Sequence, residues 1–410
     1  MTDPTIRTRL VFHIGGFDPK PPIRMHGRFV RELRRFERTW LATASVSAIA
    51  VETDQAVWNV VTSGPNWRVE TRCHLVRWDD IMEELGCRPA WRRIPHGLLA
   101  FADFVKGGAL WGYARTSVRY ALFFLYPYVI FAALAALAGF AGTFIAGGSG
   151  SVSLGIATAV AVFLALLGGA SRWLYLPLMF DDWIFARNYI RRRDPILDRR
   201  LDFFAQQIVA AALAKEADEI LIFCHSLGAV IGVDLVDRAL RYDPDFGLVG
   251  SRVALVTSAS SILKIGLHRG ANRFHAALAR VAAARSPFWV DYQARADWLS
   301  FFKTDPVAGS RLRATGRPVL RNARIRDMVD PAAYIQLRRN FYRLHCQFVS
   351  GNERRASYDY FMLFCGPLSA EYQVSLPDGA RSAIGKDGAL LELPREQHEL
   401  TATDKETTDQ

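Results

Sequence analysis

One serine lies where a short apolar segment gives way to a helical pattern. Ser226 follows the apolar run 219–224, and a helical pattern over 229–240 begins shortly after it. A serine on such a strand-to-helix turn can act as a nucleophile, because the strained turn exposes its hydroxyl and the helix N-terminus favours negative charge. The turn needs small residues two positions before and after the serine. Gly228 meets this requirement, whereas Cys224 stands where a glycine is usual.

The segment Phe223-Cys224-His225-Ser226-Leu227-Gly228-Ala229 resembles the nucleophile elbow of the α/β-hydrolase superfamily, in its lipase and esterase branch. The resemblance implies acyl-transfer chemistry and a triad in the chain order serine, acid, histidine. It also implies that His225 shapes the elbow without serving as the base. One donor for the oxyanion would be the amide of Leu227, and a second would come from a loop after an early strand.

An early segment ends in two glycines and can supply that second amide. The strand-like stretch 9–14 runs into Gly15, Gly16 and Phe17, which is similar to the His-Gly-Phe loop of lipases. We assign the second oxyanion amide to Phe17, with Gly16 as the next candidate. A plain Gly-Gly turn between a strand and a loop is the alternative interpretation.

The order of the triad leaves few candidates for the base. Four of the nine histidines follow the serine, namely His268, His275, His345 and His398. The first two come too early for the last strand, and His398 lies in a polar tail. His345 is therefore the predicted general base. A surface or capping histidine on a helix expected over 331–349 is the alternative.

The stretch 298–307 is similar to the aromatic strand ending in Asp-Pro-Val that carries the triad aspartate in many hydrolases. Asp305 is therefore the predicted acid. The proline after it fixes an extended turn that lets the carboxylate reach the imidazole. A capping aspartate is the alternative reading of Asp305, and Asp297 and Asp291 are the alternative acids.

Two stretches, 120–146 and 152–170, contain no charged residue and are long enough to cross a hydrocarbon core of about 30 Å as helices. The uncharged connection 147–151 permits only a tight reversal, so the pair is expected to form a transmembrane hairpin. Basic residues flank its outer ends, which by the positive-inside rule places the bulk of the chain on the cytoplasmic side of the inner membrane. A pair of buried core helices is the alternative.

Outside the hairpin the chain alternates strand-like and helix-like patterns, which predicts an α/β fold with a mostly parallel sheet and helices on both faces. We expect an α/β-hydrolase core formed by 1–104 and 199–376, interrupted by a membrane insertion over 105–198. Residues 377–410 are polar and poor in aromatic residues. They are expected to form a disordered tail.

Composition narrows the possible cofactors and partners. The five cysteines of the 410-residue chain are scattered without CxxC spacing, which argues against a zinc site or a disulfide framework. There is no P-loop, Rossmann glycine pattern or HExxH, so no cofactor or metal is expected. The net charge of +11 comes from short arginine clusters without Gly/aromatic interleaving. This favours contact with a lipid bilayer over nucleic acid.

The sequence therefore predicts a membrane-anchored serine hydrolase that cleaves lipid-like carboxylic esters through Ser226, His345 and Asp305. An acyltransferase or thioesterase would use the same triad. A membrane scaffold or partner-binding protein that keeps the hydrolase fold without catalysis is the alternative from another class, and Cys224 in the elbow is its main support.

Overall fold

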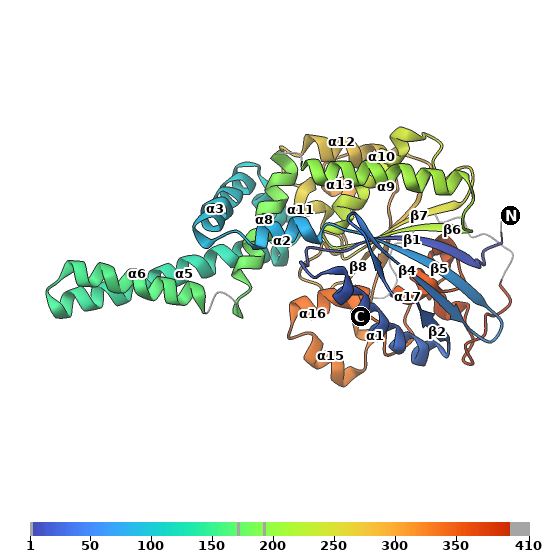
Figure 1. Cartoon of the computed structure of the whole chain (residues 1–410), viewed down its shortest axis with the longest axis horizontal. Coiled ribbons are helices and arrows are strands. Elements are labelled where there is room, and N and C mark those ends of the chain that lie inside the picture. The colour runs from blue at the N-terminus through green and yellow to red at the C-terminus, as the bar shows by residue number, and fades with distance from the viewer. Residues whose placement is uncertain (1–2, 170–172, 192–193, 394–410) are drawn as a thin grey trace. The chain divides into compact units, whose positions relative to one another are not determined.

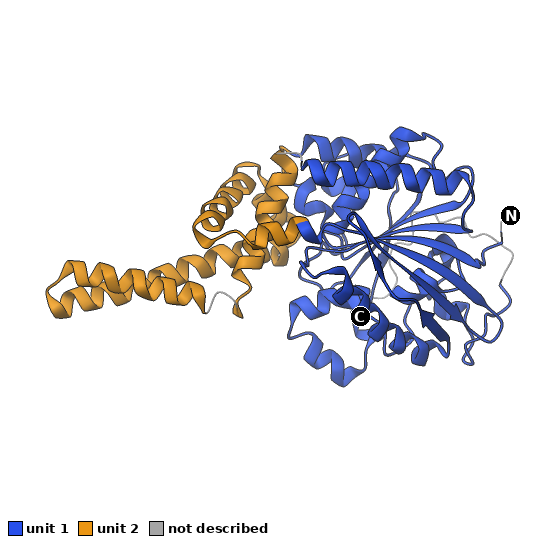
Figure 2. Cartoon of the chain, in the orientation of Figure 1, with its two compact units in different colours: residues 1–80, 194–267, 271–410 blue, residues 81–193, 268–270 orange. Residues whose placement is uncertain are grey.

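A computed structural model describes residues 3–169, 173–191 and 194–393. The chain divides into two compact units, shown in Figures 1 and 2: unit 1 comprises 1–80, 194–267 and 271–410, and unit 2 comprises 81–193 and 268–270. Unit 2 includes residues 81–104, which the sequence analysis placed in the hydrolase core. The membrane insertion over 105–198 stays a prediction.

Unit 1 is built on a nine-stranded mixed sheet whose central strands are parallel. Its main path runs β2-β4-β5-β1-β6-β7-β8-β9, and β3 pairs with β4. The strands are β1 (Thr8–Ile14), β2 (Thr43–Val46), β3 (Ala50–Val51), β4 (Gln55–Ser63), β5 (Arg68–Val76), β6 (Glu219–His225), β7 (Arg252–Ser258), β8 (Phe288–Gln293) and β9 (Val319–Asn322). Among the nine strands of the described residues, the three pairings of β4 are antiparallel. The predicted α/β class with a mostly parallel sheet is confirmed.

Helices cover both faces of this sheet (Figure 1). One face carries α9 (Pro195–Leu213), α10 (Gly228–Tyr242) and α12 (Asn272–Ala283), and the other carries α1 (Pro22–Trp40) and α17 (Tyr360–Cys365). The remaining helical segments of the unit are α11 (Ile262–Gly266), α13 (Pro306–Gly309), α14 (Ile325–Met328), α15 (Pro331–Leu337), α16 (Phe341–His345), η1 (Cys346–Val349), α18 (Ala370–Ser375) and η2 (Gly379–Ser382).

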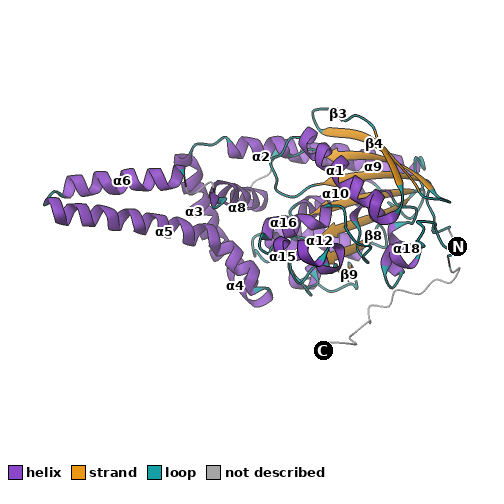
Figure 3. Cartoon of the chain, turned by 90° about the horizontal axis from the view of Figure 1, so that it is seen from below, coloured by secondary structure: helices purple, strands orange, loops and turns teal. Residues whose placement is uncertain are grey.

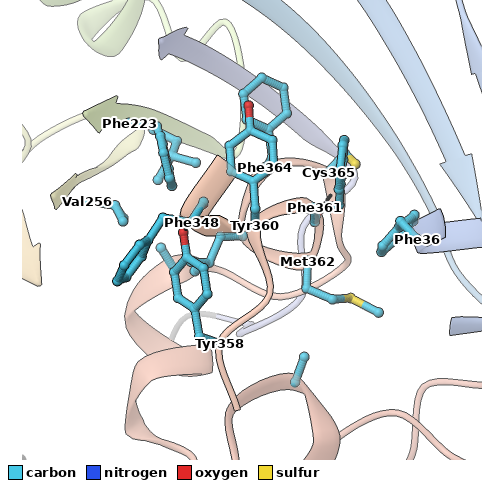
Figure 4. Close-up of a cluster of buried hydrophobic side chains, with 14 of the residues drawn as sticks. Phe36, Phe223, Val256, Phe348, Tyr358, Tyr360, Phe361, Met362, Phe364 and Cys365 are labelled. Carbon is cyan, nitrogen blue, oxygen red and sulfur yellow. Dashed lines mark hydrogen bonds between the residues drawn. The ribbon is translucent and has the colours of Figure 1, made fainter. Parts of the chain in front are cut away.

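An aromatic cluster fills the space between the sheet and helix α1. The short helix α17 contributes Tyr360 and Phe364 (Figure 4). The Tyr360 ring contacts that of Phe223 on β6, and the Phe364 ring contacts that of His13 on β1. Phe36 of α1 packs against the same helix through Phe361. These buried rings remove a large apolar area from water, so the cluster holds the C-terminal segment against the centre of the sheet.

A buried ion pair ties the same C-terminal segment to the two central strands. Arg9 on β1 and Glu219 on β6 are register partners, and their side chains meet at 2.8 Å with almost no exposure. The Arg9 guanidinium also donates to the carbonyls of Gly366 and Leu368, and Glu219 accepts from the Ala370 amide. Such a pair is tolerated in the interior because the remaining donors and acceptors are satisfied.

Residues 377–393, which the sequence assigned to the disordered tail, are part of the folded unit 1. Ala380, Ala383 and Ile384 are buried, and Ile384 forms an isolated β-bridge with Leu390. The remainder of that predicted tail, 394–410, lies outside the described residues.

Unit 2 is helical and contains two long apolar helices (Figure 3). Its elements are most of α2 (Asp79–Gly86), α3 (Ala90–Lys106), α4 (Ala109–Thr116), α5 (Val118–Ser149), α6 (Val152–Gly168) and α8 (Leu176–Arg191). Within the described residues, one helix, α5, is long and apolar enough to cross a membrane, and 11% of its most apolar window is buried. The shorter α6 has 17 residues. The end of the second predicted span, Ala170, lies outside the described residues.

The helices α5 and α6 lie side by side, and small residues set their spacing. A Cβ at Gly142 of α5 would lie 2.6 Å from the carbonyl oxygen of Gly155 on α6. Such contact between backbones requires glycine at both positions. Phe140 and Phe144 of α5 are 70% and 73% exposed, so the pair leaves much of its apolar surface uncovered.

Candidate active site

Ser226 occupies a strained turn between β6 and α10. Its φ is +57°, a left-handed conformation that few residues other than glycine adopt. Main-chain hydrogen bonds hold it there: the Ser226 amide donates to the Ser258 carbonyl at 3.0 Å, and the Ser226 carbonyl accepts from the Ser261 amide at 3.1 Å. The end of the neighbouring strand β7 therefore fixes a backbone that a free chain would avoid.

The end of β1 packs directly against this turn. A Cβ on Gly228 would overlap the carbonyl oxygens of Ile14 and Gly15, so the first turn of α10 can approach β1 only because residue 228 lacks a side chain. A Cβ on Gly16 would lie 2.9 Å from the Ser226 Cβ and 3.4 Å from its Oγ. The Gly-Gly segment thus borders the serine, as the sequence analysis expected of an oxyanion loop.

Cys224 is accommodated by a glycine on the following helix. A Cβ on Gly232 would overlap the Cys224 Sγ, so the thiol fills the space that a side chain at position 232 would take. The larger side chain at position 224 is thus compensated by the absence of a side chain at position 232. Burial raises the pKa of the Cys224 thiol, which makes this group a packing element rather than a nucleophile.

His345 pairs with a buried carboxylate. Its Nδ1 lies 2.9 Å from Asp297 Oδ2, and both side chains are almost completely buried. The other Asp297 oxygen accepts from the Leu299 amide at 3.0 Å, which orients the carboxylate. The His345 Nε2 is buried and has no hydrogen-bond partner within the described residues. An imidazole whose Nδ1–H faces a carboxylate presents an unprotonated Nε2, the arrangement of a general base.

His225 connects the elbow to this histidine. Its ring centroid lies 4.6 Å from that of His345, and its Nε2 donates to the His345 carbonyl at 3.2 Å. Burial and the neighbouring His345 lower the pKa of His225 well below its usual value, so it is neutral near pH 7. The residue before Ser226 therefore supports the backbone of the predicted base.

The carboxylate that meets His345 is Asp297 and not the predicted Asp305. Asp305 instead caps α13, where its Oδ1 accepts from the amides of Val307 and Ala308. The sequence prediction read 298–305 as a strand, but the strand is β8, and 298–305 is an irregular segment after it. Asp297 follows the true strand by four residues. Proline after Asp305 marks a helix start here.

The other alternative acid, Asp291, lies within β8 and points to different partners. It accepts from the Thr257 hydroxyl at 2.6 Å and from the Gln293 side-chain amide at 2.8 Å. Burial raises its pKa to about 6. Its two oxygens are thus engaged in the sheet interior, away from His345.

The helix expected over 331–349 is divided into α15, α16 and η1. Asn340 begins a new helix because its side chain accepts from the Arg343 amide at 2.9 Å. His345 is the last residue of α16. His345 thus stands at a helix end rather than in a helix interior, and its ring packs against that of His225, the residue before Ser226.

The two predicted oxyanion residues flank the serine in different ways. Leu227 is the N-cap residue of α10, where backbone amides lack intrahelical acceptors. Phe17 follows Gly16 in the loop that borders Ser226, and its ring lies 6.0 Å from that of Trp78 in an edge-on contact. The Trp78 indole also donates to the Gly15 carbonyl, which anchors this loop.

No group of three or more His, Cys, Asp or Glu side chains that could hold a metal ion occurs among residues 3–169, 173–191 and 194–393. Comparison of the chain with protein-family models, curated proteins and solved structures finds no match. Function is therefore argued from the geometry of this site alone.

The packing of the Cys224 side chain against Gly232 can be tested through the stability of the protein. We expect Gly232→Ala to destabilise the protein by about 1–3 kcal/mol, because the new methyl group overlaps the Cys224 Sγ. Adding Cys224→Gly should restore most of the loss. The thermal midpoint of the detergent-solubilised chain, followed by tryptophan fluorescence, measures both effects. Gly27→Ala, whose Cβ would meet nothing within 4 Å, is the matched control. Additive effects of the two substitutions would contradict the packing argument.

Proposed function

We propose that this chain is a serine hydrolase of carboxylic esters, related in mechanism to the α/β-hydrolases, with Ser226 as nucleophile, His345 as base and Asp297 as acid. The observation that carries the proposal is the buried His345, paired with Asp297 through Nδ1 and unpartnered at Nε2 within the described chain. Its ring packs against that of His225, which precedes a serine at a positive φ. Unpartnered buried nitrogens and strained serines are costly, and both have a use in acyl transfer.

In the proposed reaction the Ser226 hydroxyl adds to the carbonyl carbon of the ester while its proton passes to His345 Nε2. Asp297 stabilises the imidazolium through Nδ1. The amides of Leu227 and Phe17 hold the oxyanion. Collapse of this intermediate expels the alcohol, which takes the proton from His345. Water, deprotonated by His345, then attacks the acyl-enzyme and releases the carboxylic acid.

The same residues perform two related reactions. An alcohol in place of water makes the chain an acyltransferase, and a thioester in place of an ester makes it a thioesterase. The alternative of a non-catalytic scaffold relied on Cys224 in the elbow. Cys224 is compatible with the elbow, because the space for its thiol is provided by Gly232. No cofactor or metal enters the proposed reaction.

We also propose that α5 and α6 form a transmembrane hairpin that anchors the protein in the inner membrane, with the bulk of the chain on the cytoplasmic side. Support comes from the uncharged sequence, from the exposed apolar side chains of α5, and from the glycine contact between the two helices. At about 1.5 Å per residue, α5 exceeds the thickness of a hydrocarbon core. The proposed substrates are therefore lipid-like esters at the bilayer surface.

The nucleophile is tested with a fluorophosphonate probe on the full chain in membranes. We expect strong labelling of the wild type and none of Ser226→Ala, because the probe bonds only to an activated serine. Ser258→Ala, at the end of β7, is the serine control and should keep its label. A Ser226→Ala variant that labels like the wild type would sink the enzyme proposal.

The acid is tested by comparing Asp297→Asn with Asp305→Asn. We expect the first to lower the rate of probe labelling and of ester turnover by about 10³–10⁴-fold, since the amide favours the wrong imidazole tautomer. The second keeps a helix cap, because an asparagine side-chain oxygen accepts the same backbone hydrogen bonds, and it should leave turnover within a few fold of the wild type. Turnover of short-chain nitrophenyl esters gives the comparison. The reverse ranking of the two variants would return the role to Asp305.

The membrane proposal is tested by carbonate extraction and by labelling of cysteines in vesicles. We expect the full chain to remain in the membrane pellet. A membrane-impermeant maleimide should reach Cys87, which is exposed, only in inverted vesicles. It should reach a cysteine introduced as Ser149→Cys, at the end of α5, only in right-side-out vesicles. Release by carbonate, or labelling of both positions from one side, would contradict the hairpin.

A further inference from the structure

A pocket of about 470 Å³ lies in unit 1. Its wall combines apolar side chains, among them Phe29, Trp58 and Leu75, with four cationic ones. The cations are Lys20, Arg24, Arg28 and Arg31, and Asp18 is the one acidic residue in the lining. A pocket of this size with few polar groups on an apolar wall is typical of small-molecule binding.

Positive charge at the N-terminus of α1 is unfavourable unless an anion is bound nearby. Arg24 lies in the first turn of α1, which has no acidic residue and no side-chain cap. The N-terminus of a helix carries a partial positive charge, so basic side chains there repel it as well as one another. Arg24, Arg28 and Arg31 share one side of α1, at spacings of four and three residues. A bound anion would offset this cost.

The single carboxylate of the pocket does not neutralise the arginines. Asp18 pairs with Lys20 at 2.7 Å and accepts from the Tyr342 hydroxyl at 3.0 Å. Arg28 donates to the Cys346 carbonyl and the Ser350 hydroxyl, which are uncharged acceptors. Neither Arg24 nor Arg28 forms a salt bridge in the part of the chain that the structure describes.

A second polar group without a partner lines the same pocket. His13 on β1 is 7% exposed, and its Nδ1 has no hydrogen-bond partner among the described residues. Burial, with a further contribution from Arg28, lowers its pKa to about 4, so the ring is neutral near pH 7. A neutral imidazole can donate one hydrogen bond to a ligand in the pocket.

Two chain segments that line the pocket also lie next to Ser226 or His345 in the sequence or in space. The segment between His13 and Asp18, both in the pocket wall, contains Gly16, which touches Ser226. Val349 of the wall follows His345 by four residues, and Arg28 bonds to the carbonyl of the residue next to His345. The same two segments, 13–18 and 345–349, therefore contribute to the pocket wall and to the surroundings of Ser226 and His345.

We propose that this pocket binds the anionic head group, a phosphate or carboxylate, of the ester whose acyl carbon is attacked by Ser226. This substrate class rests on the proposed hydrolase function, and it makes the natural substrate an acidic amphiphile. The arginines hold the anion by charge-assisted hydrogen bonds, and the apolar wall takes the adjoining part of the molecule.

Binding is measured by calorimetry on the full chain carrying Ser226→Ala, which removes turnover from the readout. The ligands are dihexanoyl phosphatidic acid, dihexanoylglycerol, which lacks the phosphate, and inorganic phosphate. We expect the phosphatidic acid to bind at least tenfold more tightly than the other two. Arg24→Gln and Arg28→Gln should each weaken its binding about tenfold and leave dihexanoylglycerol unchanged. Arg34→Gln, exposed on α1 outside the pocket, is the matched control.

Arg24→Gln decides the outcome even if Arg28→Gln fails to fold, because Arg24 is exposed and its side chain forms no hydrogen bond or ion pair within the described chain. Equal binding of phosphatidic acid by wild type, Arg24→Gln and Arg34→Gln would overturn the proposal. Tight binding of inorganic phosphate alone would support an anion site and overturn the head-group assignment. Arginine-dependent binding without Ser226 labelling would leave the anion pocket standing while the hydrolase proposal fails.

Discussion

The close approach of β1, β6 and α10 at Ser226 is the constraint on which the rest of unit 1 depends. The serine adopts a positive φ because hydrogen bonds to Ser258 and Ser261 fix its backbone, and because Gly228 allows α10 to touch the end of β1. Each contact comes from a different strand or loop. The strain at one residue is therefore sustained by the whole centre of the sheet, in the way that strained functional residues are usually retained.

Three buried histidines near this turn differ in their hydrogen-bond partners. The histidines His13, His225 and His345 are each almost fully buried, but their partners differ: Asp297 for His345, a carbonyl for His225, and none at Nδ1 for His13 within the described chain. Only the first of these can stabilise a protonated ring. This difference is why the proposed proton-transfer role falls to His345 and not to His13 or His225.

The local sequence was sufficient to predict those strands and helices that are marked by an apolar run or by glycines. The strand before Ser226, the helix after it and the Gly-Gly end of β1 were predicted because apolar runs and glycines mark them directly. The strand β8 was missed, and 298–305 was read as a strand instead, because both are apolar and aromatic. The predicted acid, Asp305, came from that stretch, whereas the carboxylate that meets His345 is the alternative, Asp297. Likewise, Ile384 was assigned to a disordered tail because its burial depends on distant residues.

By itself the sequence determined the α/β class, the apolar helices of unit 2 and the identity of Ser226 and His345 as candidates. These follow from periodicity, hydropathy and chain order, which are properties of neighbouring residues. Tertiary structure alone decided that Asp297 meets His345, that Gly232 makes room for Cys224, and that the arginines of α1 share a pocket with His13. Each of these joins residues far apart in the chain, and only the packing of strands and helices brings them within contact distance.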